Sequence, residues 1–397
     1  MDVLVLKLTA IHVFGLAGLG IVLGEGLLRL APVLARLSVP RAILGGLTLA
    51  LVALALRDRV VNFELDEQLR NLLMIAFFTT IGFGASLRLL RTGGLKVLIF
   101  LGASVLGLVA QLGFGAVAAS GLGKPPLFGV IPGAVALTGG PATALAFGPE
   151  LEKAGVVGAS TIGVAAAVFG IIVSGMLGGF VGSYLIRRDG LSPTPGETLG
   201  DADIDIDSGP RERHGSMLAH LVVLGMTMAL GAVLSDFIKA WQPMPAYIGA
   251  MLVAALVRNL DDRFQFAGLD QDKTQAIGEV ALELFIVMAI VTLKLWQLVD
   301  LALPVLLILL GQVVITVGIA WTCVYWLMGR SYTAAVAAGG YTGFMLGTTA
   351  NAMASMNVIV KRTGPAPQAF FAVGIVGTFL IDFVNSVLIT FAMKVLK

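Results

Sequence analysis

Ten apolar stretches, separated by shorter polar segments, recur along the 397 residues of the chain. They cover roughly residues 8–29, 40–56, 71–89, 95–120, 157–185, 217–238, 246–260, 280–298, 303–328 and 368–395. A helix needs about 20 predominantly apolar residues to cross the hydrocarbon core of a bilayer. The pattern therefore predicts an all-α integral membrane protein with about ten transmembrane helices.

Two further apolar segments, residues 127–156 and 332–364, contain residues that interrupt helices. The first holds a Thr-Gly-Gly-Pro run at 138–141, and the second holds glycines and threonines from Gly339 to Asn351. Backbone without helical hydrogen bonds is tolerated at membrane depth only where protein or a watery cavity supplies partners. Such breaks in corresponding places of two halves are typical of a transporter's substrate site. We expect each segment to form a re-entrant hairpin whose tip reaches the middle of the membrane.

A polar segment, residues 187–215, divides the chain into the halves 1–186 and 216–397. The segment is rich in proline, aspartate and arginine and lacks apolar periodicity, so we expect a flexible linker. Polar markers recur between the halves at a nearly constant offset, with Gln111 matched by Gln312. Coincidence among apolar residues is the alternative. Because five spans is an odd number, we predict two inverted five-span repeats, each with a re-entrant hairpin.

Lysine and arginine are more frequent in alternate loops, including the central linker. Loops that carry such an excess lie in the cytoplasm. The bias predicts that both termini lie outside and that the linker is cytoplasmic. The first hairpin would then enter the membrane from outside and the second from inside. We also expect the first span to stay attached, because no convincing cleavage site follows it.

Composition supports the membrane assignment, since 57% of the residues are hydrophobic and 13% are charged. Soluble domains carry about 25% charged residues. A net charge of +2 argues against a nucleic-acid partner, and Cys323 is the sole cysteine, so no disulfide framework or cysteine metal cluster is expected. Common hydrolase and phosphate-loop motifs are also missing from the sequence, which disfavours an enzyme.

The hairpin tips carry the candidate substrate ligands. Helix N-termini exposed at such tips present free N–H groups and a positive dipole end to an anion. The alternative is close helix packing, because Gly339, Gly343 and Gly347 are spaced four apart. The candidate substrate ligands are Thr138, Gly139, Gly140, Thr143, Thr342, Gly343, Thr348, Thr349 and Asn351.

Asp382 lies in the middle of the last apolar stretch, with Asn385 one helical turn later on the same face. A carboxylate at that depth costs about 2.5–3.5 kcal/mol on insertion scales and indicates function. Oxygen ligands suit a small hard cation, so we expect Asp382, Asn385, Thr138 and Gly343 to hold sodium. A structural aspartate hydrogen-bonded to a neighbouring helix is the alternative. Residues expected to support the site are Gln111, Gln312 and Thr80.

The chain resembles the bacterial sodium/glutamate symporter family over essentially its whole length. The resemblance is carried by segments 61–63, 73–82, 293–296, 301–304 and 381–385, and by both hairpin motifs. It implies a secondary transporter of the bacterial inner membrane with inverted repeats and a scaffold for homodimerisation. It also implies Na⁺ as the coupling ion, L-glutamate as the solute and no organic cofactor.

The chain departs from the family pattern at both motifs. Pro141 and Ala142 stand where the family has histidine and glycine, and Tyr341 and Met345 are bulkier than expected. These departures affect the expected solute before the mechanism. Three alternatives stay open: a carrier of di- or tricarboxylates, coupling to protons instead of sodium, and a channel-like pore.

Overall fold

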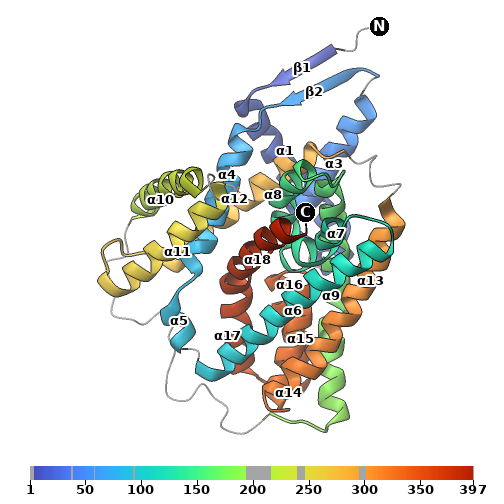
Figure 1. Ribbon diagram of the computed structural model, residues 1–397, viewed down its shortest axis with the longest axis vertical. Coiled ribbons are helices and arrows are strands. Elements are labelled where there is room, and N and C mark those ends of the chain that lie inside the picture. The colour runs from blue at the N-terminus through green and yellow to red at the C-terminus, as the bar shows by residue number, and fades with distance from the viewer. Residues whose placement is uncertain are drawn as a thin grey trace.

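The computed structural model describes residues 4–36, 39–57, 59–92, 94–193, 216–238, 246–294 and 301–396. Over these ranges the chain is mainly helical (Figure 1). Seven of the described helices are long and apolar enough to span a membrane, as expected for an integral membrane protein. They are α1 (Ala10–Leu30), α6 (Gly94–Gly121), α9 (Ala159–Arg188), α10 (Met217–Ile238), α12 (Gln271–Val291), the run Ala302–Leu327 and the run Pro367–Val395. The count of ten spans stays a prediction.

The last two of these seven spans are composite helices. The first comprises α13 (Ala302–Ile319), η3 (Ala320–Val324) and α14 (Tyr325–Leu327), and the second comprises α17 (Pro367–Ile375), η4 (Val376–Leu380) and α18 (Ile381–Val395). The remaining helices are α2 (Pro32–Arg36), α3 (Arg41–Leu56), α4 (Gln68–Gly84), α5 (Leu87–Thr92), α7 (Pro126–Val130), η1 (Ile131–Thr138), α8 (Gly140–Lys153), α11 (Ala246–Phe264), α15 (Tyr332–Leu346) and α16 (Thr349–Thr363). Helix α9 reaches Arg188, beyond the expected boundary at 186, and residues 194–215 of the predicted linker lie outside the described residues.

A small parallel sheet, which the sequence did not predict, accompanies the helices. Strand β1 (Leu4–Leu8) pairs with β2 (Val61–Leu65) in the register Leu4–Val61 to Leu8–Leu65. Both strands alternate between their two faces, and the outward Lys7 and Glu64 form an ion pair of 3.3 Å. Figure 1 shows the sheet at one end of the molecule, where α1 begins and α3 ends. Five-residue strands give too short a pattern to stand out beside long apolar helices.

The helices pack in two groups, which we call the first and second bundles. The first bundle comprises α1, α3, α4, α10, α11 and α12, and the second comprises α6, α7, η1, α8, α9, α13, α15, α16, α17 and α18. Glycines bring backbones together within the first bundle, since a Cβ on Gly45 of α3 would overlap the Gly20 carbonyl of α1. The bundles meet where Phe147 of α8 packs edge-on to Tyr247 of α11, with ring centroids 5.4 Å apart.

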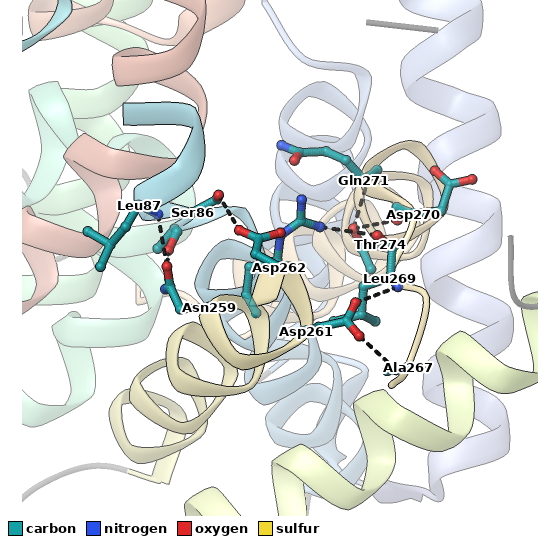
Figure 2. A network of polar contacts seen from close by, with 12 residues as sticks. Ser86, Leu87, Asn259, Asp261, Asp262, Ala267, Leu269, Asp270, Gln271 and Thr274 are labelled. Atoms are coloured by element: carbon teal, nitrogen blue, oxygen red, sulfur yellow. Dashed lines mark hydrogen bonds and ion pairs between the residues drawn. The ribbon is translucent and has the colours of Figure 1, made fainter. Parts of the chain in front are cut away.

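A polar network fixes α11 at the end of the first bundle (Figure 2). Asp261 accepts hydrogen bonds from the backbone N–H groups of Ala267, Gly268 and Leu269, which shapes the turn towards α12. Asp262 pairs with Arg258 at 3.0 Å and accepts a hydrogen bond from Ser86.

Asn259, in the same network, receives the Leu87 N–H and donates to the Ala85 carbonyl. Its amide therefore satisfies backbone groups in the non-helical connection between α4 and α5. The network holds α11 against the connection between α4 and α5 and against the turn that leads to α12.

Candidate functional site

The first interrupted segment breaks at two places. Pro132 and Gly133 have non-helical backbone angles inside η1, and Gly133 reaches φ −137° and ψ −120°. The second break follows Thr138, where Gly140 adopts φ +65°. Glycine alone enters this left-handed region readily. Helix α8 therefore restarts at Gly140, within the predicted Thr-Gly-Gly-Pro run.

The second interrupted segment breaks in the later part of the predicted stretch from Gly339 to Asn351. Helix α15 runs without interruption through Gly339–Gly343, so the expectation of a break there is wrong. A Cβ on Gly343 would lie 2.6 Å from the Ala352 Cα of α16, and one on Gly340 would lie 2.7 Å from the Met356 sulfur. These glycines allow α15 and α16 to pack as a close antiparallel pair. The break falls at Gly347 and Thr348, which both have non-helical angles.

The two breaks lie against each other. A Cβ on Gly140 would lie 3.9 Å from Thr348 Cγ2 and 4.0 Å from the Gly347 carbonyl oxygen. Helices α8 and α16 both begin at this point. Gly139, Thr348 and Thr349 are half-exposed, whereas most neighbouring residues are buried. Two helix N-termini thus converge at an accessible place inside the second bundle.

Gln111 of α6 joins the two interrupted segments. Its Oε1 accepts a hydrogen bond of 2.8 Å from the Thr138 hydroxyl, and its Nε2 donates to the Met345 carbonyl at 2.9 Å. Thr138 ends η1 and Met345 lies in the last turn of α15. Gln111 is fully buried, so its amide holds the end of one segment against the end of the other.

Gln312 of α13 completes the contact. Its Nε2 donates to the backbone carbonyl of Gln111 at 2.8 Å and lies beside Gly133. Its Oε1 is buried and has no hydrogen-bond partner. Because an unpaired buried oxygen is costly, such an atom indicates a place where a ligand or ion can bind.

Asn385 of α18 reaches the first break. Its Nδ2 donates to the Ala134 carbonyl at 2.8 Å, and the same carbonyl accepts the Gly139 N–H at 3.0 Å. Asn385 is 1% exposed, and its Oδ1 has no partner. This amide oxygen therefore offers a ligand atom close to the backbone of the first break, near Gly139.

Asp382 is half-buried, one turn before Asn385. In the described part of the chain no lysine, arginine or histidine lies within ion-pair distance of its carboxylate. Ser386 donates to the Asp382 backbone carbonyl rather than to the carboxylate. Helix α18 and the preceding η4 also contact α4 of the first bundle, so Asp382 belongs to the helix that lies between the breaks and that bundle.

Three of the predicted residues lie in helix interiors. The Thr342 hydroxyl donates to the Ala338 carbonyl within α15, and Gly343 faces Ala352. Thr80 bonds the Phe77 carbonyl and packs against Gly278 of α12 in the first bundle.

Three other predicted tip residues make capping and anchoring contacts. Thr348 caps α16 by accepting the Asn351 N–H, and Thr349 donates to the Gly377 carbonyl of η4 at 2.5 Å. Asn351 also bonds the Ile171 carbonyl of α9 at 3.1 Å. The Met345 carbonyl and Gly347 were not predicted, because a backbone acceptor leaves no side-chain signal in the sequence.

Neither break carries a basic side chain. Lys153 lies in the last turn of α8, and Lys361 and Arg362 lie in the last turn of α16. These charges are at the far ends of the helices whose N-termini meet. Positive potential at the breaks therefore comes from backbone N–H groups and helix dipoles.

Comparisons with known proteins identify the family. The family model described as sodium/glutamate symporter matches residues 6–365. The sodium/glutamate symporter of Escherichia coli strain K12 is 35% identical to the chain over 384 residues, which cover 94% of each protein. The protein of the same name from Haemophilus influenzae is 30% identical over 393 residues, which cover 96% of each. The chain belongs to the sodium/glutamate symporter family.

Proposed function

We propose that the chain is a secondary active transporter that carries L-glutamate into the cell together with Na⁺. Its family membership supports this, since the relatives from Escherichia coli and Haemophilus influenzae are both named sodium/glutamate symporters. The structural observation that supports the proposal, in addition to the names of these relatives, is that the N-termini of α8 and α16 meet at Gly140 and Thr348.

The convergent helix N-termini bind the solute. Glutamate has two carboxylates, and an anion is stabilised by the free N–H groups and positive dipole end of a helix. The proposed substrate site has residues from both breaks. They are Gly139, Gly140 and Thr143 of the first break and Thr348, Thr349 and Asn351 of the second. Thr342 and Gly343 support it indirectly, because they fix how α15 packs on α16.

Sodium binds beside the same breaks. Oxygen atoms are the ligands that small hard cations prefer, and the Asn385 Oδ1 and the Gln312 Oε1 are buried oxygens without partners. Thr138 adds a hydroxyl oxygen, and Asp382 adds negative charge on the same helix as Asn385. Bound Na⁺ would offset the charge of the solute as both cross the membrane.

The bulky residues near the second break do not argue against glutamate. A Cβ on Gly107 of α6 would contact both the Tyr341 hydroxyl and the Met345 methyl group. Glycine at 107 therefore leaves the room that these two side chains fill within the bundle. Pro141 occupies the first turn of α8, where a missing N–H breaks no helical hydrogen bond.

The second bundle carries the solute past the first. Both interrupted segments belong to the second bundle, and the first bundle forms the homodimer scaffold. The contact between Gln111 and Gln312, which occupy equivalent places in the two halves, supports an inverted repeat. We also propose that both termini lie outside, that the linker is cytoplasmic, and that the membrane is the bacterial inner membrane.

Uptake of labelled glutamate into proteoliposomes tests the function. An inward Na⁺ gradient should accelerate uptake, and replacement of Na⁺ by K⁺ should abolish the acceleration. Uptake indifferent to Na⁺ would refute sodium coupling. Counterflow then separates a carrier from a pore, because only a carrier exchanges labelled for unlabelled solute.

A further inference from the structure

A cavity of about 590 Å³ lies in the first bundle, beneath the parallel sheet. Its roof is the inward face of the strands, where Leu6 opposes Phe63 and Leu8 opposes Leu65. Its walls come from α1, α3 and the end of α12. Those wall residues are Ile11, His12, Gly15, Leu16, Leu19, Leu49, Val52, Ala53 and Val291.

The lining excludes a polar ligand. Among the lining residues that the structure describes, His12 has the one polar side chain. Its Nδ1 already accepts the Thr9 N–H at 3.3 Å and lies 2.8 Å from the Thr9 hydroxyl. A buried water needs two to four polar partners, which this lining does not supply. The occupant is therefore apolar.

The length of the α1 wall fits an acyl chain that runs along the membrane normal. Its α1 wall extends from Ile11 to Leu19, a rise of about 12 Å at 1.5 Å per residue. That length is close to one leaflet of the hydrocarbon core, which is about 30 Å thick in total. Ile11 and Leu19 are 83% and 48% exposed, so the cavity opens towards the surrounding lipid.

Two arginines follow the helix that lines one wall of the cavity. Arg57 and Arg59 lie between the end of α3 and the start of β2, two elements that line the cavity. Ala53, one turn before Arg57 on α3, lines the cavity. A phospholipid whose phosphate lies beside these arginines would place its acyl chain along the α1 wall of the cavity.

We propose that the cavity binds one acyl chain of a membrane phospholipid, with the headgroup phosphate beside Arg57 and Arg59. The bound chain fills the space between sheet and helices and ties the sheet to the first bundle. An isolated pair of strands is marginally stable in water, so a chain packed on its apolar face stabilises it. This lipid site is separate from the transport site in the second bundle.

Two glycines of α1 provide a matched test. A Cβ added at Gly15 or at Gly18 would meet no atom within 4 Å, but only Gly15 lines the cavity. Gly15→Leu fills the cavity, and Gly18→Leu adds the same side chain elsewhere on α1. Ala53→Leu fills the cavity from α3 and serves as an independent second variant.

The proteins are reconstituted in nanodiscs of equal parts phosphatidylethanolamine and phosphatidylglycerol, extracted, and weighed by native mass spectrometry. Wild type and Gly18→Leu should retain one phospholipid per protomer that Gly15→Leu and Ala53→Leu lose. Adding phospholipid back to delipidated protein should raise the Tm of the first two more than that of the filled variants. Equal lipid counts in all four proteins would overturn the proposal. So would unchanged lipid together with a loss of dimer in the filled variants, because the occupant would then be a second copy of the chain.

Discussion

The Thr138 hydroxyl donates a hydrogen bond of 2.8 Å to the Gln111 side-chain oxygen, while the same amide holds the Met345 carbonyl. Thr138 lies 27 positions from Gln111 in the chain and Met345 lies 234 positions from it, yet both bond to its buried amide. Both breaks owe their mutual position to this group. Changes at Gln111 should therefore affect both segments together.

Gln111→Leu should lower the free energy of unfolding by about 2 kcal/mol, because it leaves buried partners unsatisfied. Glutamate affinity should fall as well, since the two helix N-termini lose their common anchor. Thermal unfolding and binding titration measure the two effects. In a double-mutant cycle with Thr138→Val, the losses should be less than additive. Full additivity would show that the hydrogen bond does not couple the segments.

Asn385→Leu should abolish the Na⁺-dependent part of the thermal shift, since it removes the unpaired Oδ1. Asp382→Asn should do the same by removing the negative charge. Tm is measured with Na⁺ and with K⁺, each with and without glutamate, because a ligand of the folded state raises Tm by mass action. Thr390→Val, one turn further along α18, is the control, since its hydroxyl only bonds the Ser386 carbonyl. An unchanged Na⁺ shift in either variant removes that residue from the site.

Gly140→Ala should destabilise the protein by about 1–2 kcal/mol, because φ of +65° strains a residue with a Cβ. The effect is conformational, since the nearest atom to a Cβ there is 3.9 Å away. Gly140→Asn should lose less, because asparagine tolerates this region better. Gly113→Ala in α6, where a Cβ meets open space, should not destabilise. Equal Tm for Gly140→Ala and Gly113→Ala would contradict the left-handed conformation.

Asp262→Ala should cost about 3 kcal/mol, because it leaves the largely buried Arg258 without its carboxylate. The side chains of this pair are 12% and 13% exposed. Lys153→Ala removes an ion pair whose lysine is 73% exposed, and it should cost less than about 1 kcal/mol. Thermal unfolding of both variants in the same detergent compares them. Similar losses would mean that the network in Figure 2 does not hold α11 in place.

Asp189, just beyond the end of α9, gives a prediction for pH dependence. The hydrogen-bonded Arg188 guanidinium and then the Tyr325 hydroxyl lower the pKa of the Asp189 carboxyl to about 2. An unfolded chain has an aspartate pKa of about 3.9. The stabilisation is therefore fully present above that value and is lost as pH falls towards 2. The Tm difference between wild type and Asp189→Asn should shrink between pH 5 and pH 2; a constant difference would contradict the ion pair.

Each apolar stretch predicted from the sequence contains helix in the described residues, because burial or lipid exposure of a long apolar segment leaves helix as the way to satisfy its backbone. The sequence did not reveal the sheet. Val61–Leu65 pairs with Leu4–Leu8 only because α1 and α3 bring those ends together. Such a pairing depends on contacts more than fifty residues apart in the chain.

Glycine content located the first break closely, but it gave only a broad range for the second. The pair at 139–140 includes a positive φ and a following proline, and both have local causes. The glycines at 340 and 343 have the same composition, but they face α16 and serve packing. Whether a glycine breaks a helix or allows a neighbour to approach depends on what lies opposite it.

The sequence by itself determined the class of protein, the two interrupted segments and the paired glutamines, because hydropathy, helix-breaking residues and polar residues in apolar surroundings are local properties. Only the tertiary structure decided that Gln111 bonds Thr138 and the Met345 carbonyl, that Asn385 lies behind the first break, and that an apolar cavity lies under the sheet. These relationships join distant segments, and they follow from how the helices pack.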